Sequence, residues 1–232
     1  MEVHVDVAKV GKYAVGVSGD SVEVVERPCG GISIVIIDGQ GHGRAAKRMS
    51  HMIANQAARL IEDGARDGAV MRVINDHLYA FRDGQVSATA TILSADVAHR
   101  CLVVSRNSNT PVLVAAQGKA RSLDAPVEPI GVRRLLKPSL THLELVEGMV
   151  LMGFTDGVIH AGRGRRGMFS LERACQLMAQ EQPARELANS VLRYALELEE
   201  GKPRDDMVVA VMKVVGRGSK LGIRRVSASY PL

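Results

Sequence analysis

The order in which hydrophobic periodicity changes along the chain is the feature that most limits its fold. Short β-rich runs come first, and two consecutive amphipathic helices follow. More strands, two more helices and a final strand complete the order. Two helices in succession do not fit a regular βαβ alternation. The order instead predicts an α+β fold, an αββα sandwich of two antiparallel sheets packed face to face and flanked by helix pairs.

Turn and capping residues set the expected boundaries. Strands are expected at 12–18, 21–27, 32–37, 86–93, 99–105, Val112–Ala116, 143–146, 149–154 and Met207–Val215. Helices are expected from Arg44 to Gly64, over 69–81, over 171–179 with Ser170 as the N-cap, and over Ala184–Leu198 after Pro183. We therefore expect one domain over residues 1–215 and a basic C-terminal tail over 216–232.

The net charge of +5 does not indicate a nucleic-acid partner. Five of the 30 basic residues and none of the 25 acidic ones lie from Lys213 onward, which leaves 25 of each before that residue. Aromatic residues, on which single-stranded nucleic acids stack, make up only 3% of the chain. We therefore expect no nucleic-acid partner.

Apolar runs and cysteines indicate where the protein is located. No apolar run reaches the roughly 18 residues of a membrane span, and the first residues lack the basic-then-apolar order of a signal peptide. Three scattered cysteines do not indicate a disulfide framework or a zinc site. We expect a cytoplasmic protein with no membrane partner.

Four aspartates stand at the ends of expected strands, and three of them adjoin a glycine that permits a sharp turn. They are Asp20, Asp38, Asp156 and Asp205. Hard cations such as Mg²⁺ and Mn²⁺ prefer carboxylate oxygens, and several unpaired carboxylates in one place would repel each other without a cation. A single Asp-Gly pair usually marks only a turn. The prediction of a metal site therefore depends on the four residues together.

The segment Asp38-Gly39-Gln40-Gly41-His42-Gly43, between an expected strand and an expected helix, resembles a family motif. It matches the Asp-Gly-x-Gly-x-Gly element of the metal-dependent type 2C (PPM) protein phosphatases, in the form of their bacterial SpoIIE branch. Three more segments resemble motifs of that branch in the same order, namely 18–20 (Ser-Gly-Asp), 154–158 (Phe-Thr-Asp-Gly-Val) and 204–207 (Arg-Asp-Asp-Met). The resemblance covers roughly residues 5–215.

The resemblance implies a phosphatase for phosphoserine and phosphothreonine in regulatory proteins, with STAS-domain proteins of the stressosome as expected substrates. It also implies two Mn²⁺ or Mg²⁺ ions, with catalysis assigned to Asp38, Asp156 and Asp205. Asp38 would bridge the ions, and the Gly39 carbonyl would ligate one of them. Asp156 and Asp205 would hold the other ion, while Asp20 would act directly or through water. Water between two such ions can attack phosphorus in line.

The proton donor to the leaving group stays open. Many eukaryotic members have His directly after the Asp-Gly pair, whereas this chain has Gln40. His42 either transfers a proton or belongs only to the turn. Three arginines of a loop rich in glycine also have two interpretations, because Arg163, Arg165 and Arg166 either steer a phosphoprotein or form an ordinary solvated loop.

Two other functions fit parts of the sequence. Residues 41–46 match a Gly-x-Gly-x-x-Ala dinucleotide fingerprint, but Asp38 would then face a pyrophosphate with no cation between them. The expected helix also leads to another helix and not to a parallel strand. The leading alternative is a pseudophosphatase, which keeps the fold and docks a partner without hydrolysis.

Overall fold

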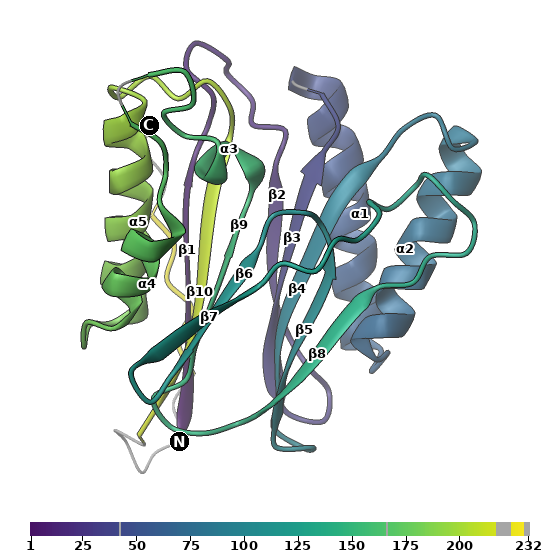
Figure 1. The fold of residues 1–232 in the computed structure, drawn as a ribbon. Coiled ribbons are helices and arrows are strands. Elements are labelled where there is room, and N and C mark those ends of the chain that lie inside the picture. The colour runs from purple at the N-terminus through teal and green to yellow at the C-terminus, as the bar shows by residue number, and fades with distance from the viewer. Residues whose placement is uncertain (42, 166, 217–223, 230–232) are drawn as a thin grey trace.

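The computed structural model describes residues 1–41, 43–165, 167–216 and 224–229. Their strands form two five-stranded antiparallel sheets (Figure 1). The first sheet has the order β1 (Glu2–Val10), β10 (Met207–Val215), β9 (Val150–Phe154), β6 (Val112–Ala116) and β7 (Lys119–Leu123). The second has the order β2 (Ser21–Glu26), β3 (Gly31–Gly39), β4 (Ala88–Asp96), β5 (Cys101–Asn107) and β8 (Ser139–Glu144).

A helix pair covers the outer face of each sheet (Figure 1). Helices α4 (Leu171–Met178) and α5 (Ala184–Leu198) pack on the first sheet, and α1 (Gly43–Glu62) and α2 (Asp67–Arg82) pack on the second. The short helix α3 (Asp156–Ile159) follows β9 directly. The predicted αββα sandwich is confirmed, and Ser170 caps α4 by accepting a hydrogen bond from the Arg173 amide at 3.2 Å.

Alternating side chains explain why the central strands are apolar throughout. On β3, Ile34 and Ile36 lie in the core between the sheets, whereas Val35 and Ile37 pack against α1 and α2. Strand β10 alternates in the same way between the central core and the layer under α4 and α5. Both sheets are buried on two faces, so three layers of hydrophobic core stack across the molecule.

The expected strand at 12–18 is wrong. The first strand is β1, and residues 12–18 form a loop between β1 and β2. Ala14 has a positive φ of 60°, and the Tyr13 amide donates to the Pro203 carbonyl at 2.8 Å. Backbone groups of this loop are therefore satisfied by the distant segment before β10 and not by a neighbouring strand.

Strand β7 and helix α3 were not predicted, and β8 begins at Ser139, before the expected 143. β7 lies at a sheet edge and exposes Lys119 and Arg121, so it has no apolar run. It pairs with β6 through the two-residue turn Gln117-Gly118, where both residues have positive φ (50° and 74°). That is the geometry of a type I′ hairpin turn, which Gly118 favours.

The basic tail is only partly within the described residues. Arg224 forms an ion pair with Glu26 at the end of β2, whereas Arg217 and Lys220 lie outside the described ranges. Strand β10 ends at Val215 and pairs along the whole length of β1. Within the described residues, no helix has the length and apolarity needed to span a membrane.

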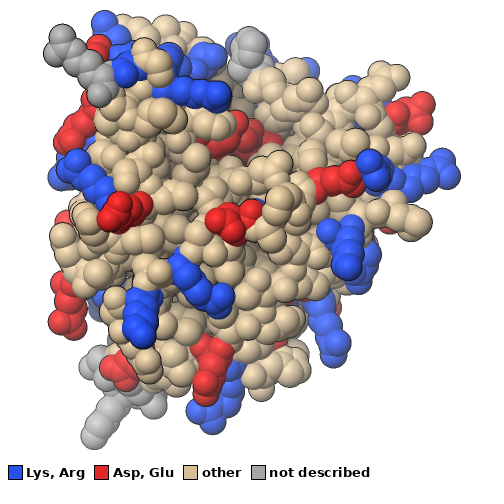
Figure 2. Space-filling model, in the orientation of Figure 1, with Lys and Arg blue, Asp and Glu red and all other residues tan. Residues whose placement is uncertain are grey.

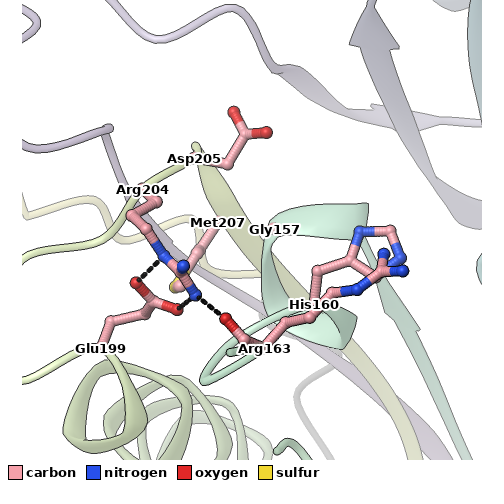
Figure 3. Close-up of a pocket in the computed structure, with 7 residues that line it drawn as sticks. All are labelled: Gly157, His160, Arg163, Glu199, Arg204, Asp205 and Met207. Carbon is pink, nitrogen blue, oxygen red and sulfur yellow. Dashed lines mark hydrogen bonds and ion pairs between the residues drawn. The ribbon is translucent and has the colours of Figure 1, made fainter. Parts of the chain in front are cut away.

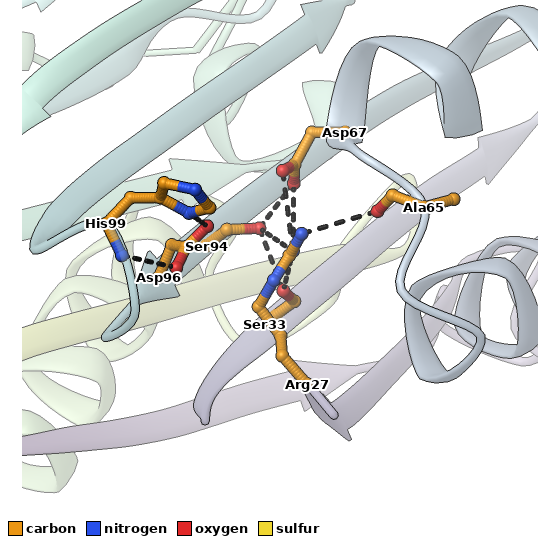
Figure 4. Close-up of polar contacts among 7 residues, drawn as sticks. All are labelled: Arg27, Ser33, Ala65, Asp67, Ser94, Asp96 and His99. Carbon is orange, nitrogen blue, oxygen red and sulfur yellow. Dashed lines mark hydrogen bonds and ion pairs between the residues drawn. The ribbon is translucent and has the colours of Figure 1, made fainter. Parts of the chain in front are cut away.

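A buried ion pair fastens α2 to the second sheet (Figure 4). Nη1 of Arg27 lies 3.4 Å from Oδ2 of Asp67, and the two side chains are only 8% and 7% exposed. Arg27 also donates to the hydroxyls of Ser33 (3.0 Å) and Ser94 (3.2 Å) and to the carbonyl of Ala65 (3.3 Å). The network joins β2, β3 and β4 to the start of α2.

We expect Asp67→Ala to lower the free energy of unfolding by about 3–5 kcal/mol, because it leaves the Arg27 guanidinium buried without its counter-charge. Urea denaturation followed by circular dichroism measures the loss. The matched control is Asp63→Ala, an exposed aspartate between α1 and α2, which should change stability by less than about 0.5 kcal/mol. Equal losses in the two variants would show that the pair does not fasten α2.

Candidate active site

The four predicted aspartates lie at one end of the sandwich. Asp38 is near the end of β3 and Asp20 directly precedes β2, its antiparallel neighbour. Asp156 begins α3 after β9 and Asp205 precedes β10, which are also antiparallel neighbours. Strand ends from both sheets therefore meet here. Figure 2 shows acidic side chains in a hollow near the top of the view.

The carboxylates lie close enough to perturb one another. Burial, followed by the negative charges of Asp20, Asp156 and Asp205, raises the pKa of Asp38 to about 8. Burial raises the pKa of Asp20 to about 7, and the negative charge of Asp206 adds to this effect. Burial and the charge of Asp205 also raise the pKa of Asp156. The predicted residues thus form one electrostatic group.

No lysine or arginine forms an ion pair with these carboxylates within the described ranges. The ion pairs that Lys and Arg make there involve neither Asp20, Asp38, Asp156 nor Asp205. Among the residues that the structure describes, the buried Oδ2 of Asp20 has no hydrogen-bond partner. Buried, mutually repelling carboxylates with a free acceptor atom suit a hard divalent cation, so this set of donors fits Mn²⁺ or Mg²⁺.

The aspartates do not form a closed ligand shell. Across residues 1–41, 43–165, 167–216 and 224–229, no three Asp, Glu, His or Cys side chains are grouped closely enough to hold one metal ion. Asp20 is 3% exposed and Asp38 is half-buried, whereas Asp205 is exposed. The assignment of metal ligands stays a prediction.

Gly157 and Asp206 fix the start of β10 against α3 and against the 12–19 loop. A Cβ at position 157 would lie 2.1 Å from the Asp206 carbonyl oxygen, so only glycine lets α3 approach the start of β10 this closely. The buried Asp206 carboxylate accepts hydrogen bonds from the amides of Lys12 (2.8 Å) and Gly19 (2.6 Å). It therefore fixes both ends of the 12–19 loop, just before Asp20.

The main chain of Asp20 is held by residues that the sequence analysis missed. Lys9 of β1 and Lys47 of α1 both donate to the Asp20 carbonyl, at 2.6 and 3.0 Å. The Ser50 hydroxyl donates to the Gly19 carbonyl at 2.5 Å. Lys47 and Ser50 share one face of the predicted helix, but nothing in the sequence pairs that face with Asp20.

The structure describes the residue that replaces the family's histidine but not the candidate proton donor. Oε1 of Gln40 accepts hydrogen bonds from the Ser87 amide (3.0 Å) and hydroxyl (3.2 Å), so this side chain fastens β3 to the segment before β4. His42 lies outside the described residues, as does Arg166. The proton donor stays open.

Comparison with known proteins identifies the family. The family model described as Stage II sporulation protein E (SpoIIE) matches residues 28–215, which include Asp38, Asp156 and Asp205. The chain belongs to the SpoIIE family. The Stage II sporulation protein E of Priestia megaterium is 22% identical to it over 214 residues, which are 91% of this chain and 36% of that protein. The chain thus spans about a third of the length of this relative.

Solved structures share the fold of this SpoIIE-family chain. The PP2C phosphatase domain of SpoIIE from Bacillus subtilis, solved with a fragment of its regulatory domain, superposes with a TM-score of 0.79 at 21% identity. That match covers 92% of this chain and 64% of the other. RsbX in complex with magnesium superposes with a TM-score of 0.71 at 16% identity, covering 90% of this chain and 94% of the other. The fold is therefore that of the PP2C phosphatases.

In EDTA, we expect this SpoIIE-family chain to lose stability as the pH rises from 5 to 9. The pKa values of Asp38 (about 8) and Asp20 (about 7) exceed the usual 3.8, so the folded state binds more protons than the unfolded state in this range. The free energy of unfolding therefore falls with rising pH. Differential scanning fluorimetry should show a Tm lower by ~5 °C at pH 9.

The asparagine variant Asp38→Asn cannot ionise at this position, so its Tm should decline less over the same pH range. The exposed control Asp63→Asn should keep the full decline. If Asp38→Asn followed the wild-type curve, the carboxylate at position 38 would not be the source of the instability.

Proposed function

We propose that this chain is a metal-dependent protein phosphatase that hydrolyses phosphoserine and phosphothreonine in regulatory proteins. The observation that supports the proposal most is the meeting of four aspartates from two sheets, with no lysine or arginine paired to their carboxylates in the described part of the chain. Membership of the SpoIIE family and the PP2C fold agree with this activity.

In the proposed site, two Mn²⁺ or Mg²⁺ ions are held by residues of this chain. Asp38 would contribute to both ions, and the carbonyl of Gly39 would ligate one of them. Asp156 and Asp205 would hold the other ion, and Asp20 would act directly or through a water. When bound, such ions lower the pKa of a water molecule and neutralise charge on the transferring phosphoryl group.

The remaining polar residues keep the proposed ligands in place. Lys9 and Lys47 bind the main-chain carbonyl of Asp20, and Oδ2 of its carboxylate has no hydrogen-bond partner among the described residues. Asp206 binds backbone amides of the 12–19 loop and has no ligand role in this proposal. Gln40 is engaged with Ser87, so we assign it no proton transfer.

The proposed substrates are phosphorylated STAS-domain proteins of the stressosome, and the proposed location is the cytoplasm. The fold shared with RsbX supports this choice of substrates, as does membership of the SpoIIE family. The proposed catalytic unit is residues 1–215, since β1 and β10 join its two ends in one sheet. Residues 216–232 form the basic tail.

One observation favours a second function, a pseudophosphatase that docks phosphoproteins without hydrolysis. In the described residues, no three potential ligand side chains are grouped closely enough to hold one ion. A protein whose carboxylates did not close around an ion would keep the fold but would not hydrolyse phosphate esters. Measurements of metal binding and of hydrolysis therefore distinguish the two functions.

We expect Mn²⁺-dependent hydrolysis of p-nitrophenyl phosphate by the wild type, none in EDTA, and a loss of about 100-fold or more in Asp38→Asn, which removes the bridging carboxylate. Isothermal titration calorimetry with Mn²⁺ should show weaker binding by the same variant. The exposed control Asp63→Asn should retain both properties. If Mn²⁺ did not raise the wild-type hydrolysis rate above the rate in EDTA, the proposed phosphatase activity would be wrong and the docking function would be favoured.

A further inference from the structure

An open pocket borders the carboxylate end of the molecule (Figure 3). Its volume is about 240 Å³, and its lining includes His160, Arg163, Glu199, Arg204 and Asp205. Asp205 is one of the proposed metal ligands, so the pocket adjoins the proposed reaction site. It lies between the loop that follows α3 and the start of β10.

Glu199, just after α5, builds the wall of this pocket. Its side chain is 2% exposed and accepts hydrogen bonds from Nε and Nη2 of Arg204, both at 2.9 Å, and from the Gly162 amide at 2.7 Å. Nη2 of Arg204 also donates to the Arg163 carbonyl at 2.6 Å. One buried carboxylate thus connects α5, the loop and the residue before Asp205.

The loop is held tightly at Gly162. This glycine has a φ of 76°, and a Cβ there would lie 2.0 Å from the Gly167 carbonyl oxygen. Any other residue would push the loop apart. The backbone around position 163 is therefore fixed by tertiary contacts.

The arginines of this region have different partners. Arg165 pairs with Glu200 at 2.8 Å and lies 3.8 Å from Glu199, and Arg204 is bound by Glu199. The Arg163 side chain is exposed and has no ion pair or hydrogen bond in the described part of the chain. Arg165 and Arg204 therefore have structural roles, whereas the Arg163 guanidinium is available to a ligand.

His160 lies on the same side of the pocket as Arg163. Figure 3 shows both side chains pointing away from Glu199. The imidazole of His160 is 54% exposed, and its Nδ1 lies 4.0 Å from Oδ2 of Asp156. An exposed imidazole N–H adds a hydrogen-bond donor beside the guanidinium.

We propose that Arg163, with His160 beside it, forms a subsite for an acidic side chain next to the phosphorylated residue of the substrate protein. The inference rests on the proposed phosphatase function and names its substrate class. A free guanidinium binds a carboxylate through two parallel hydrogen bonds. The carboxylate of Asp205, which lines the pocket, repels an acidic residue, whereas the Arg163 guanidinium attracts it.

The experiment compares two phosphoserine peptides that differ only at the flanking positions, Glu in one and Gln in the other. The wild type should prefer the Glu peptide in kcat/KM, and Arg163→Gln should reduce this preference about fivefold, mainly through KM. Arg163→Lys, which keeps the charge but not the planar fork, should retain part of the preference. The control Arg193→Gln removes one exposed charge on α5 and should leave the preference unchanged.

Fluorescence anisotropy with the labelled Glu peptide in EDTA provides a readout independent of turnover. Weaker binding by Arg163→Gln than by Arg193→Gln supports the subsite even if hydrolysis is absent, in which case the phosphatase proposal alone fails. A wild type that hydrolyses p-nitrophenyl phosphate with Mn²⁺ but shows the same peptide preference as Arg163→Gln overturns the subsite alone. Equal binding by both variants also overturns it.

Discussion

Repulsion among carboxylates is the constraint on which the rest of this structure depends. Asp20, Asp38 and Asp156 have raised pKa values because they are buried near one another and near further acids. Like charges held together at low dielectric cost several kcal/mol, about as much as the margin by which a domain is stable. The three apolar layers offset this cost. In the layer under α1 and α2, the buried residue Ile37 directly precedes Asp38.

The polar contacts around Asp20 support its position without forming an ion pair with its carboxylate. Two lysines approach this residue, yet both bind its carbonyl oxygen and not its carboxylate. Asp206 holds the preceding loop through backbone amides. Because the anchors lie on β1, on α1 and before β10, the position of Asp20, which precedes β2 of the second sheet, depends on the first sheet and on one helix. These contacts keep its carboxylate in place despite repulsion by the neighbouring acids.

Most of the fold was predictable because its strands are buried on two faces and its helices on one. Helix α5 and strands β6 and β10 have the predicted bounds, since continuous apolar runs or 3.6-residue spacing identify them directly. The loop at 12–18 has β-rich composition, but Asp206 and Pro203 bind its backbone from about 190 residues away. Strand β7 has charged residues because it lies at an edge. Local sequence indicates neither the distant partners of the 12–18 loop nor the position of β7 at the sheet edge.

The same limit applies to the site. Motifs predicted which aspartates meet, because strand ends of an antiparallel sandwich gather at one edge. They could not predict that Asp206 is structural while its neighbour Asp205 is exposed, since the two differ only in tertiary partners. Arg163 and Arg165 show the point equally well. Both lie in one glycine-rich loop, and the carboxylates of Glu199 and Glu200 pair with Arg165, whereas Arg163 has no ion pair among the described residues. Function at this edge therefore depends less on which charged residues are present than on which of them the fold leaves without a partner.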